Sequence, residues 1–157
     1  MKKTVILLMA IWLISPPVTT PVAAEESVRV LDAWARASIL ASRPAAAYAT
    51  IESASDDRLL GVTTPAADQV MIHAIEKDGD VSRMKPVGAL AIPAGKRVTL
   101  APGGMHMMLM GLHDKLDEGA TFPMTLSFEK SGEVTVEVSV LGIAADGPEN
   151  SERGAGQ

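Results

Sequence analysis

The feature that most constrains the fold of this chain is a series of short apolar or alternating runs separated by residues that favour turns. The clearest run ends with Val136, Val138 and Val140, which alternate with polar residues as the two faces of a β-strand require. Many short strands at close spacing predict an all-β domain, built as a sandwich or a barrel. We predict strands at residues 28–33, 46–51, 59–63, 69–75, 81–86, 97–100, 105–110, 124–128 and 134–140.

The first 24 residues have the composition of a secretory signal peptide. Lys2 and Lys3 form a basic start, residues 5–14 are apolar, and Val22-Ala23-Ala24 offers the small residues that precede a cleavage site. The apolar run is about half the length that a membrane-spanning helix needs, so we prefer a leader to a membrane anchor. Because the sequence contains no cysteine, we do not expect a lipoprotein anchor. We therefore expect an exported, soluble domain that starts at Glu25.

The remaining chain has the size of one ordinary domain with a single core. Removing Lys2 and Lys3 leaves 12 of the 14 basic residues against 19 acidic ones, which is a net charge of −7. This charge argues against binding to nucleic acid or to anionic lipid. We place the folded domain at residues 25–143 and expect a disordered tail at residues 144–157, which contain almost nothing to bury.

Four residues within the β-rich stretch are candidate metal ligands, namely His73, Met84, His106 and Met108. Thioether sulfur and neutral imidazole together suit a soft ion, above all Cu(I), and suit Mg²⁺ or Ca²⁺ poorly. Taken alone, His73 would be better interpreted as a hydrogen-bonded core histidine, and Met84 as a core methionine. The hypothesis of a copper site therefore depends on the set.

Strand periodicity separates these ligands from neighbouring methionines. Residues two apart on a strand share a face, so His106 and Met108 are expected side by side, about 6.6 Å apart along the strand. Met105 and Met107 would point the other way, and we interpret them as core. Met110 shares the His106 face one step farther along, and we interpret it as a wall of the site.

The spacing of the four residues, H-x10-M-x21-H-x-M, resembles the pattern of the PCuAC family of periplasmic copper(I) chaperones. Flanking segments within residues 28–142 are also similar to that family: Asp32-Ala33-Trp34-Ala35-Arg36-Ala37, Ala46-Ala47-Tyr48, Met84-Lys85-Pro86-Val87, Ile92-Pro93-Ala94-Gly95 and, starting at Pro102, residues 102–112. The family pattern has an optional methionine where this chain has Ala74. Since Ala74 would face away from His73, no ligand is expected to be lost. The tail also lacks the histidines and methionines that hold a second copper in some relatives.

The resemblance implies a cupredoxin-like Greek-key β-barrel or sandwich that binds one Cu(I) through His73, Met84, His106 and Met108. It also implies delivery of copper in the periplasm to the CuA or CuB centre of a haem-copper oxidase. The expected partners are a cytochrome c oxidase subunit and a Sco-type thiol protein, and we expect a monomer. A blue-copper electron carrier would need a cysteine thiolate, which this chain lacks.

Other functions fit the sequence less well than copper carriage. The sequence has no G-x-S-x-G elbow and no paired histidine and nucleophile, and His113-Asp114 is interpreted as a turn after a strand, so we do not expect an enzyme. Zinc is disfavoured because two of the four candidate ligands are thioethers. The remaining alternative is a metal-free exported β-domain that acts as an interaction or assembly module, with the methionines as core.

Overall fold

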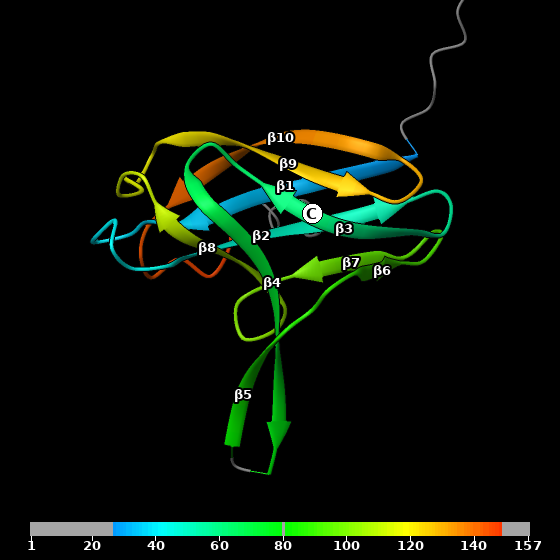
Figure 1. The fold of residues 1–157 in the computed structure, drawn as a ribbon, viewed down its shortest axis with the longest axis horizontal. Helices are drawn as coiled ribbons and strands as arrows, with labels where there is room; N and C mark the ends of the chain where they lie inside the picture. Colours follow the sequence, from blue (N-terminus) through cyan, green and yellow to red (C-terminus); the bar gives the residue numbers. More distant parts are fainter. Residues whose placement is uncertain (1–26, 80, 149–157) are drawn as a thin grey trace, which may run out of the picture.

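The computed structural model describes residues 27–79 and 81–148, and within these residues the chain forms strands and no α-helix (Figure 1). No helix able to cross a membrane is present in this part of the chain. The predicted signal peptide and most of the predicted tail lie outside the described residues. The strands are β1 (Val28–Arg36), β2 (Ala45–Ser53), β3 (Asp57–Thr63), β4 (Ala67–Asp78), β5 (Val81–Pro86), β6 (Leu90–Ile92), β7 (Arg97–Leu100), β8 (His106–Leu112), β9 (Thr121–Phe128) and β10 (Gly132–Leu141).

The strands agree closely with the sequence prediction, and the all-β prediction is confirmed. β5 and β7 have the predicted bounds, and the other predicted strands differ only at their ends. The sequence does not predict β6, because Leu90-Ala91-Ile92 is a very short run with no polar residue to give an alternation.

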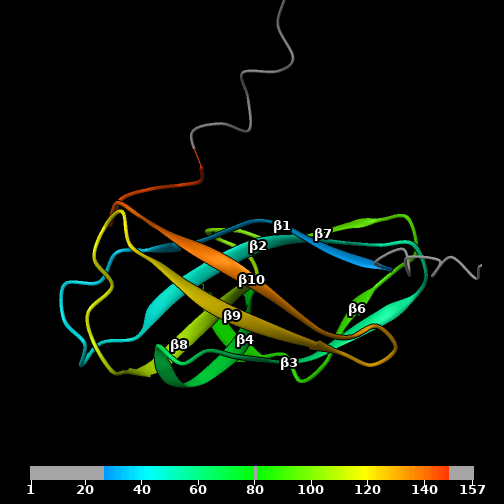
Figure 2. The same cartoon turned by 90° about the horizontal axis from the view of Figure 1, so that it is seen from above.

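One continuous path of pairing joins the strands. The order is β5-β4-β8-β2-β1-β10-β9-β3-β6, and β7 pairs with β2 beside β8. β1 and β10 are parallel, and the other recorded pairs are antiparallel. The sheet folds back on itself, since β3 also lies against β4 and β6 against β2 (Figures 1 and 2). The two halves thereby enclose one core.

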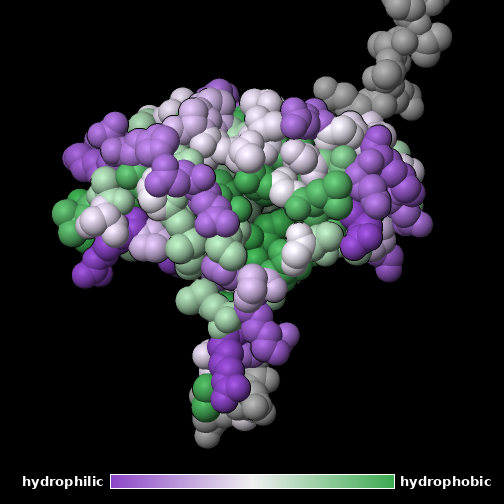
Figure 3. Space-filling view, viewed as in Figure 1, coloured by the Kyte–Doolittle hydropathy of each residue, from purple (hydrophilic) through white to green (hydrophobic). Residues whose placement is uncertain are grey.

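Alternate residues of the strands supply that core, as the strand period requires. Figure 3 shows apolar side chains gathered in the body of the molecule and polar ones on the projecting hairpin. The largest fully buried side chains come from both halves of the sheet: Ile51, Leu59, Ile92, Leu100, Met107, Leu109, Met124 and Leu126.

The hairpin formed by β4 and β5 projects from this body (Figure 1). Every residue of β5 is exposed. β5 is also an edge strand, because it pairs only with β4. Side chains on β5 are therefore accessible to other molecules.

A bulge in β1 turns an aromatic residue away from the core. The register of β1 with β2 shifts between Leu31 and Trp34, and Asp32 has a φ of 49°, which is uncommon for a residue with a side chain. Ala35 is then fully buried in the core, so Trp34 points to the outer face. There its ring packs on Tyr48, with the two ring centroids 4.4 Å apart.

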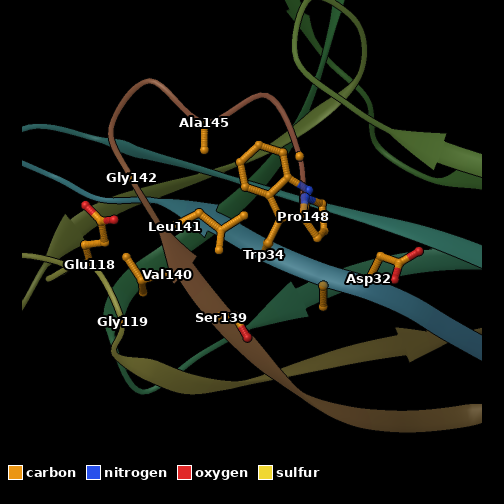
Figure 4. A pocket seen from close by; sticks show the side chains of 12 residues that line it. Asp32, Trp34, Glu118, Gly119, Ser139, Val140, Leu141, Gly142, Ala145 and Pro148 are labelled. Atoms are coloured by element: carbon orange, nitrogen blue, oxygen red, sulfur yellow. The ribbon is translucent and has the colours of Figure 1, made fainter. Parts of the chain in front are cut away.

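Residues 142–148 lie over this aromatic pair, and part of them belongs to the predicted disordered tail. Arg36 donates hydrogen bonds from Nε to the carbonyl oxygen of Ala145 (2.7 Å) and from Nη2 to Oδ1 of Asp146 (2.9 Å). Figure 4 shows Ala145 and Pro148 next to the Trp34 ring, at a cleft of about 670 Å³. The composition of residues 144–148 does not predict these contacts, because their partner, Arg36, belongs to a distant part of the sequence. Residues 149–157 lie outside the described residues.

Candidate metal centre

The two candidate histidines form a cross-strand pair. β4 and β8 are antiparallel, with His73 opposite His106, and the two ring centroids are 5.9 Å apart. The residues next to them in the chain, Ile72 and Met107, are buried in the core. Because neighbouring residues on a strand point to opposite faces, both imidazoles lie on the outer face of the sheet.

Within residues 27–79 and 81–148, each imidazole has one nitrogen without a recorded hydrogen-bond partner. Nδ1 of His106 lies 3.1 Å from the carbonyl oxygen of Gly104. A carbonyl oxygen only accepts, so Nδ1 carries the proton and Nε2 keeps its lone pair for a ligand. Nδ1 of His73 is buried and, within the described residues, has no hydrogen-bond partner. Leaving a buried polar atom unpaired costs about 1–3 kcal/mol, and a bound metal ion would remove that cost.

Met108 lies beside the histidine pair, as the strand period predicts. It is half-buried, follows His106 by two residues on β8 and is opposite Met71 of β4. The prediction that Met105 and Met107 belong to the core is confirmed, because Met107 is fully buried and Met105 packs against the core cluster.

Met84 has a different position from the other three candidates. Pro86 of β5 is opposite His73, and Met84 is opposite Ile75, two residues farther along each strand toward the tip of the hairpin. Met84 shares the outer face of the sheet, but its side chain is 60% exposed, whereas His106 is 7% exposed. The structure thus brings His73, His106 and Met108 together and leaves Met84 at the exposed margin.

Met71 contributes a further sulfur to this face, outside the four residues predicted as ligands. Met71 and His73 alternate in the run at residues 69–75, so the strand period already places them on one face. Only the pairing of β4 with β8 shows that Met71 is directly opposite Met108.

An aromatic residue of β2 follows the segment that pairs with β8. Ala47 is opposite Met107, the residue after His106, and Tyr48 is the next residue of β2. Burial raises the pKa of Tyr48; the nearby Arg36 guanidinium lowers it in part and Asp146 raises it further. The Tyr48 hydroxyl is therefore neutral at physiological pH.

The third histidine belongs to another environment. As predicted, His113 lies beyond the end of β8, where its ring nitrogens face the carbonyl oxygen of Pro65 and the carboxylate of Asp68. Across residues 27–79 and 81–148, no group of three or more His, Asp or Glu side chains is placed to hold a metal ion.

Solved structures of PCuAC domains are similar to this fold. The apo PCuAC domain of PmoF2 is 29% identical, with a TM-score of 0.63, covering 78% of this chain and 95% of that domain. Its copper-bound form is 30% identical, with a TM-score of 0.61, covering 74% and 93%. CuI-DR1885 from Deinococcus radiodurans is 31% identical, with a TM-score of 0.56, covering 76% and 83%. The cupredoxin-like fold expected from the resemblance is thereby confirmed.

Two sequence comparisons give the family. "Putative lipoprotein Lxx21020" of Leifsonia xyli subsp. xyli (strain CTCB07) is 32% identical over 124 residues, which are 77% of this chain and 74% of that protein. The family described as "Putative lipoprotein LpqE-like" matches residues 28–140. The chain belongs to the LpqE-like family.

Proposed function

We propose that this protein is a copper chaperone that binds one Cu(I) ion at the His73–His106 pair. The observation that carries the proposal is the pair itself, in which each ring keeps a nitrogen without a hydrogen-bond partner among the described residues. Met108 adds a sulfur beside the pair, and Met84 adds a second from the exposed hairpin. Two imidazoles and two thioethers form a neutral, soft ligand set suited to Cu(I).

This ligand set favours carriage over electron transfer or catalysis. The chain has no cysteine, so the site lacks the thiolate of a blue-copper centre. Thioethers do not bind protons at ordinary pH, so release of the ion requires no proton at the sulfurs. We propose a binding and transfer role without a chemical reaction on a substrate.

The similarity to copper-bound PCuAC structures supports this proposal. The lipoprotein names of the relatives favour an exported protein, and we propose the periplasm as its location. We further propose that it delivers copper for assembly of the CuA or CuB centre of a haem-copper oxidase. Its partners would be an oxidase subunit or a Sco-type protein.

Anaerobic titration with Cu(I) against a competing chelator tests the proposal, followed by X-ray absorption of the loaded protein. We expect one ion bound through nitrogen and sulfur donors. Met107→Leu is the matched control, because Met107 is a neighbouring methionine on the core face. A protein that releases all its copper to a weak chelator would instead be a metal-free interaction module. Copper with only oxygen donors would exclude ligation by the histidines and methionines.

A further inference from the structure

The outer face of β4, β5 and β8 carries more sulfur than the four candidate ligands supply. β4 lies between β5 and β8 (Figure 1), and on this face Met71 is opposite Met108 and Gln69 is opposite Met110. Side chains directly opposite in an antiparallel pair have Cβ atoms about 4.5–5.5 Å apart. Met71 therefore lies two residues from His73 along β4, on the side of the sheet that carries both histidines.

Met71 is closer to His106 within the sheet than Met84 is. Met71 and His106 are diagonal neighbours on adjacent strands, for which Cβ separations are about 7–8 Å. Met84 is on β5, so the whole of β4 lies between it and His106, at two strand spacings of about 4.8 Å each. Met71 is also half-buried, whereas Met84 is 60% exposed.

We propose that Met71 is a fifth donor of the copper site and exchanges with Met84 as the second sulfur ligand. The inference rests on the proposed function. His73, His106 and Met108 hold the ion throughout, and the fourth position is filled by Met84 or by Met71. The unbranched methionine side chain has the flexibility that such an exchange needs.

The exposure of Met84 makes it the ligand that leaves first during transfer. A receiving protein reaches the site from the projecting hairpin, where Met84 is accessible, and Met71 fills the vacated position until the incoming donor binds. Both exchanging groups are neutral thioethers and the ion remains Cu(I), so the step needs no electron and no proton.

The test compares the mature wild-type protein with Met71→Leu, Met84→Leu and the double variant. Cu(I) affinity is measured by chelator competition and the number of sulfur donors by X-ray absorption. We expect Met84→Leu to keep two sulfurs with a moderate loss of affinity. The double variant should keep one sulfur and lose more affinity than the product of the two single losses. Met110→Leu is the matched control, because Met110 is on the same face but two residues farther from the histidines than Met108 is.

A second measurement does not depend on the fold of the double variant. With ¹³C-labelled methionine methyl groups, the Met71 signal is assigned by its absence from Met71→Leu, and it should shift when Cu(I) is added to Met84→Leu. The inference is overturned if that signal does not move and Met84→Leu retains one sulfur. It is also overturned if the double variant binds as tightly as Met84→Leu. Failure of the wild-type protein to bind Cu(I) would overturn the proposed function itself, which distinguishes the two failures.

Discussion

His73 and His106 lie directly opposite each other on β4 and β8, with their ring centroids 5.9 Å apart. The two residues are distant in sequence, so they meet only when these strands pair. An ion that binds both rings therefore binds the folded chain and stabilises it relative to the unfolded chain. Copper bound at this pair, as proposed, would couple metal binding to fold stability.

His106→Ala is expected to abolish this coupling. The change removes Nε2 and also the hydrogen bond to Gly104, so the apo protein should lose about 1–3 kcal/mol of unfolding free energy. Cu(I) should raise the melting temperature of the wild-type protein and leave that of the variant nearly unchanged. His113→Ala is the control and should keep the copper-induced rise. An equal rise in all three proteins would exclude His106 as a ligand.

Met108→Leu and Met107→Leu should have opposite effects although the two residues are adjacent. Met108 shares the face of the histidines, so its replacement should weaken Cu(I) binding and leave apo stability close to wild type. Met107 is fully buried, and its nearly volume-conserving replacement should cost less than about 1.5 kcal/mol and spare binding. Chelator competition and urea unfolding measure the two effects. The reverse pattern would mean that the ion is bound by the other face of β8.

The faces of β8 on which Met107 and Met108 lie could be predicted from the sequence, because they depend only on local chain geometry. A strand has a period of two, so the sequence alone separates Met108 from Met107. The same local rule accounts for the agreement of the strands with the apolar runs. Where the run is as short as Leu90-Ala91-Ile92, the pattern carries too little information.

The remaining features depend on pairing between distant segments. Neither the contact of His73 with His106 nor the position of Met71 opposite Met108 is encoded in one run. Met84 is a candidate ligand by its spacing in the sequence, yet the edge position of β5 decides its exposure. The contacts of residues 144–148 likewise depend on Arg36, which only the folded sheet brings near.

Acid should weaken copper binding through the histidines alone. Protons compete with Cu(I) for imidazole nitrogen, whereas the thioether sulfurs do not titrate. We expect affinity to fall between neutral pH and about pH 5, with up to two protons taken up for each ion released. Chelator competition in buffers of different ionisation enthalpy measures both quantities. An affinity independent of pH over this range would argue against imidazole ligation.

His113 should titrate at a higher pH than an ordinary histidine. Its Nε2 lies 3.0 Å from the carboxylate of Asp68 and its Nδ1 lies 2.9 Å from the carbonyl oxygen of Pro65. The hydrogen bond to Asp68 is the largest cause that raises the pKa of His113, and the Pro65 carbonyl adds to it. Asp68→Asn should therefore lower this pKa, as measured by NMR titration of the ring protons.

The interaction between His113 and Asp68 also makes the stability of the fold depend on pH. The pKa of His113 is higher in the folded chain than in the unfolded chain. Its contribution to the free energy of unfolding is therefore fully present below the unfolded-state pKa and disappears as pH rises through the folded-state pKa. Gly111→Ala should disturb the pair as well, since a Cβ at Gly111 would meet the Asp68 side chain and Gly111 has a φ of 66°. An unchanged titration of His113 in both variants would contradict this account.

Asp57 is a buried carboxylate that joins β3 to the turn between β9 and β10. Oδ1 accepts hydrogen bonds from the amides of Arg58 (2.7 Å) and Lys130 (3.0 Å), and Oδ2 accepts them from the amide (3.0 Å) and the hydroxyl of Ser131. Burial raises the pKa of Asp57. The hydrogen bonds from the Ser131 hydroxyl and from the three amides outweigh it and lower the pKa to about 2.

Asp57→Asn is therefore expected to destabilise the fold in a pH-dependent way. An amide cannot accept hydrogen bonds at both of its terminal atoms, so the variant should lose about 1.5–3 kcal/mol of unfolding free energy at neutral pH. The folded pKa lies below the ordinary value of 3.8, so the wild-type advantage is present above that value and disappears as pH falls through about 2. Urea unfolding of both proteins at neutral pH and at about pH 2 measures the difference. Ser131→Ala is the control, because it removes one donor and should lose less than Asp57→Asn. A difference that stays constant across this range would mean that the carboxylate charge of Asp57 is not what stabilises the turn.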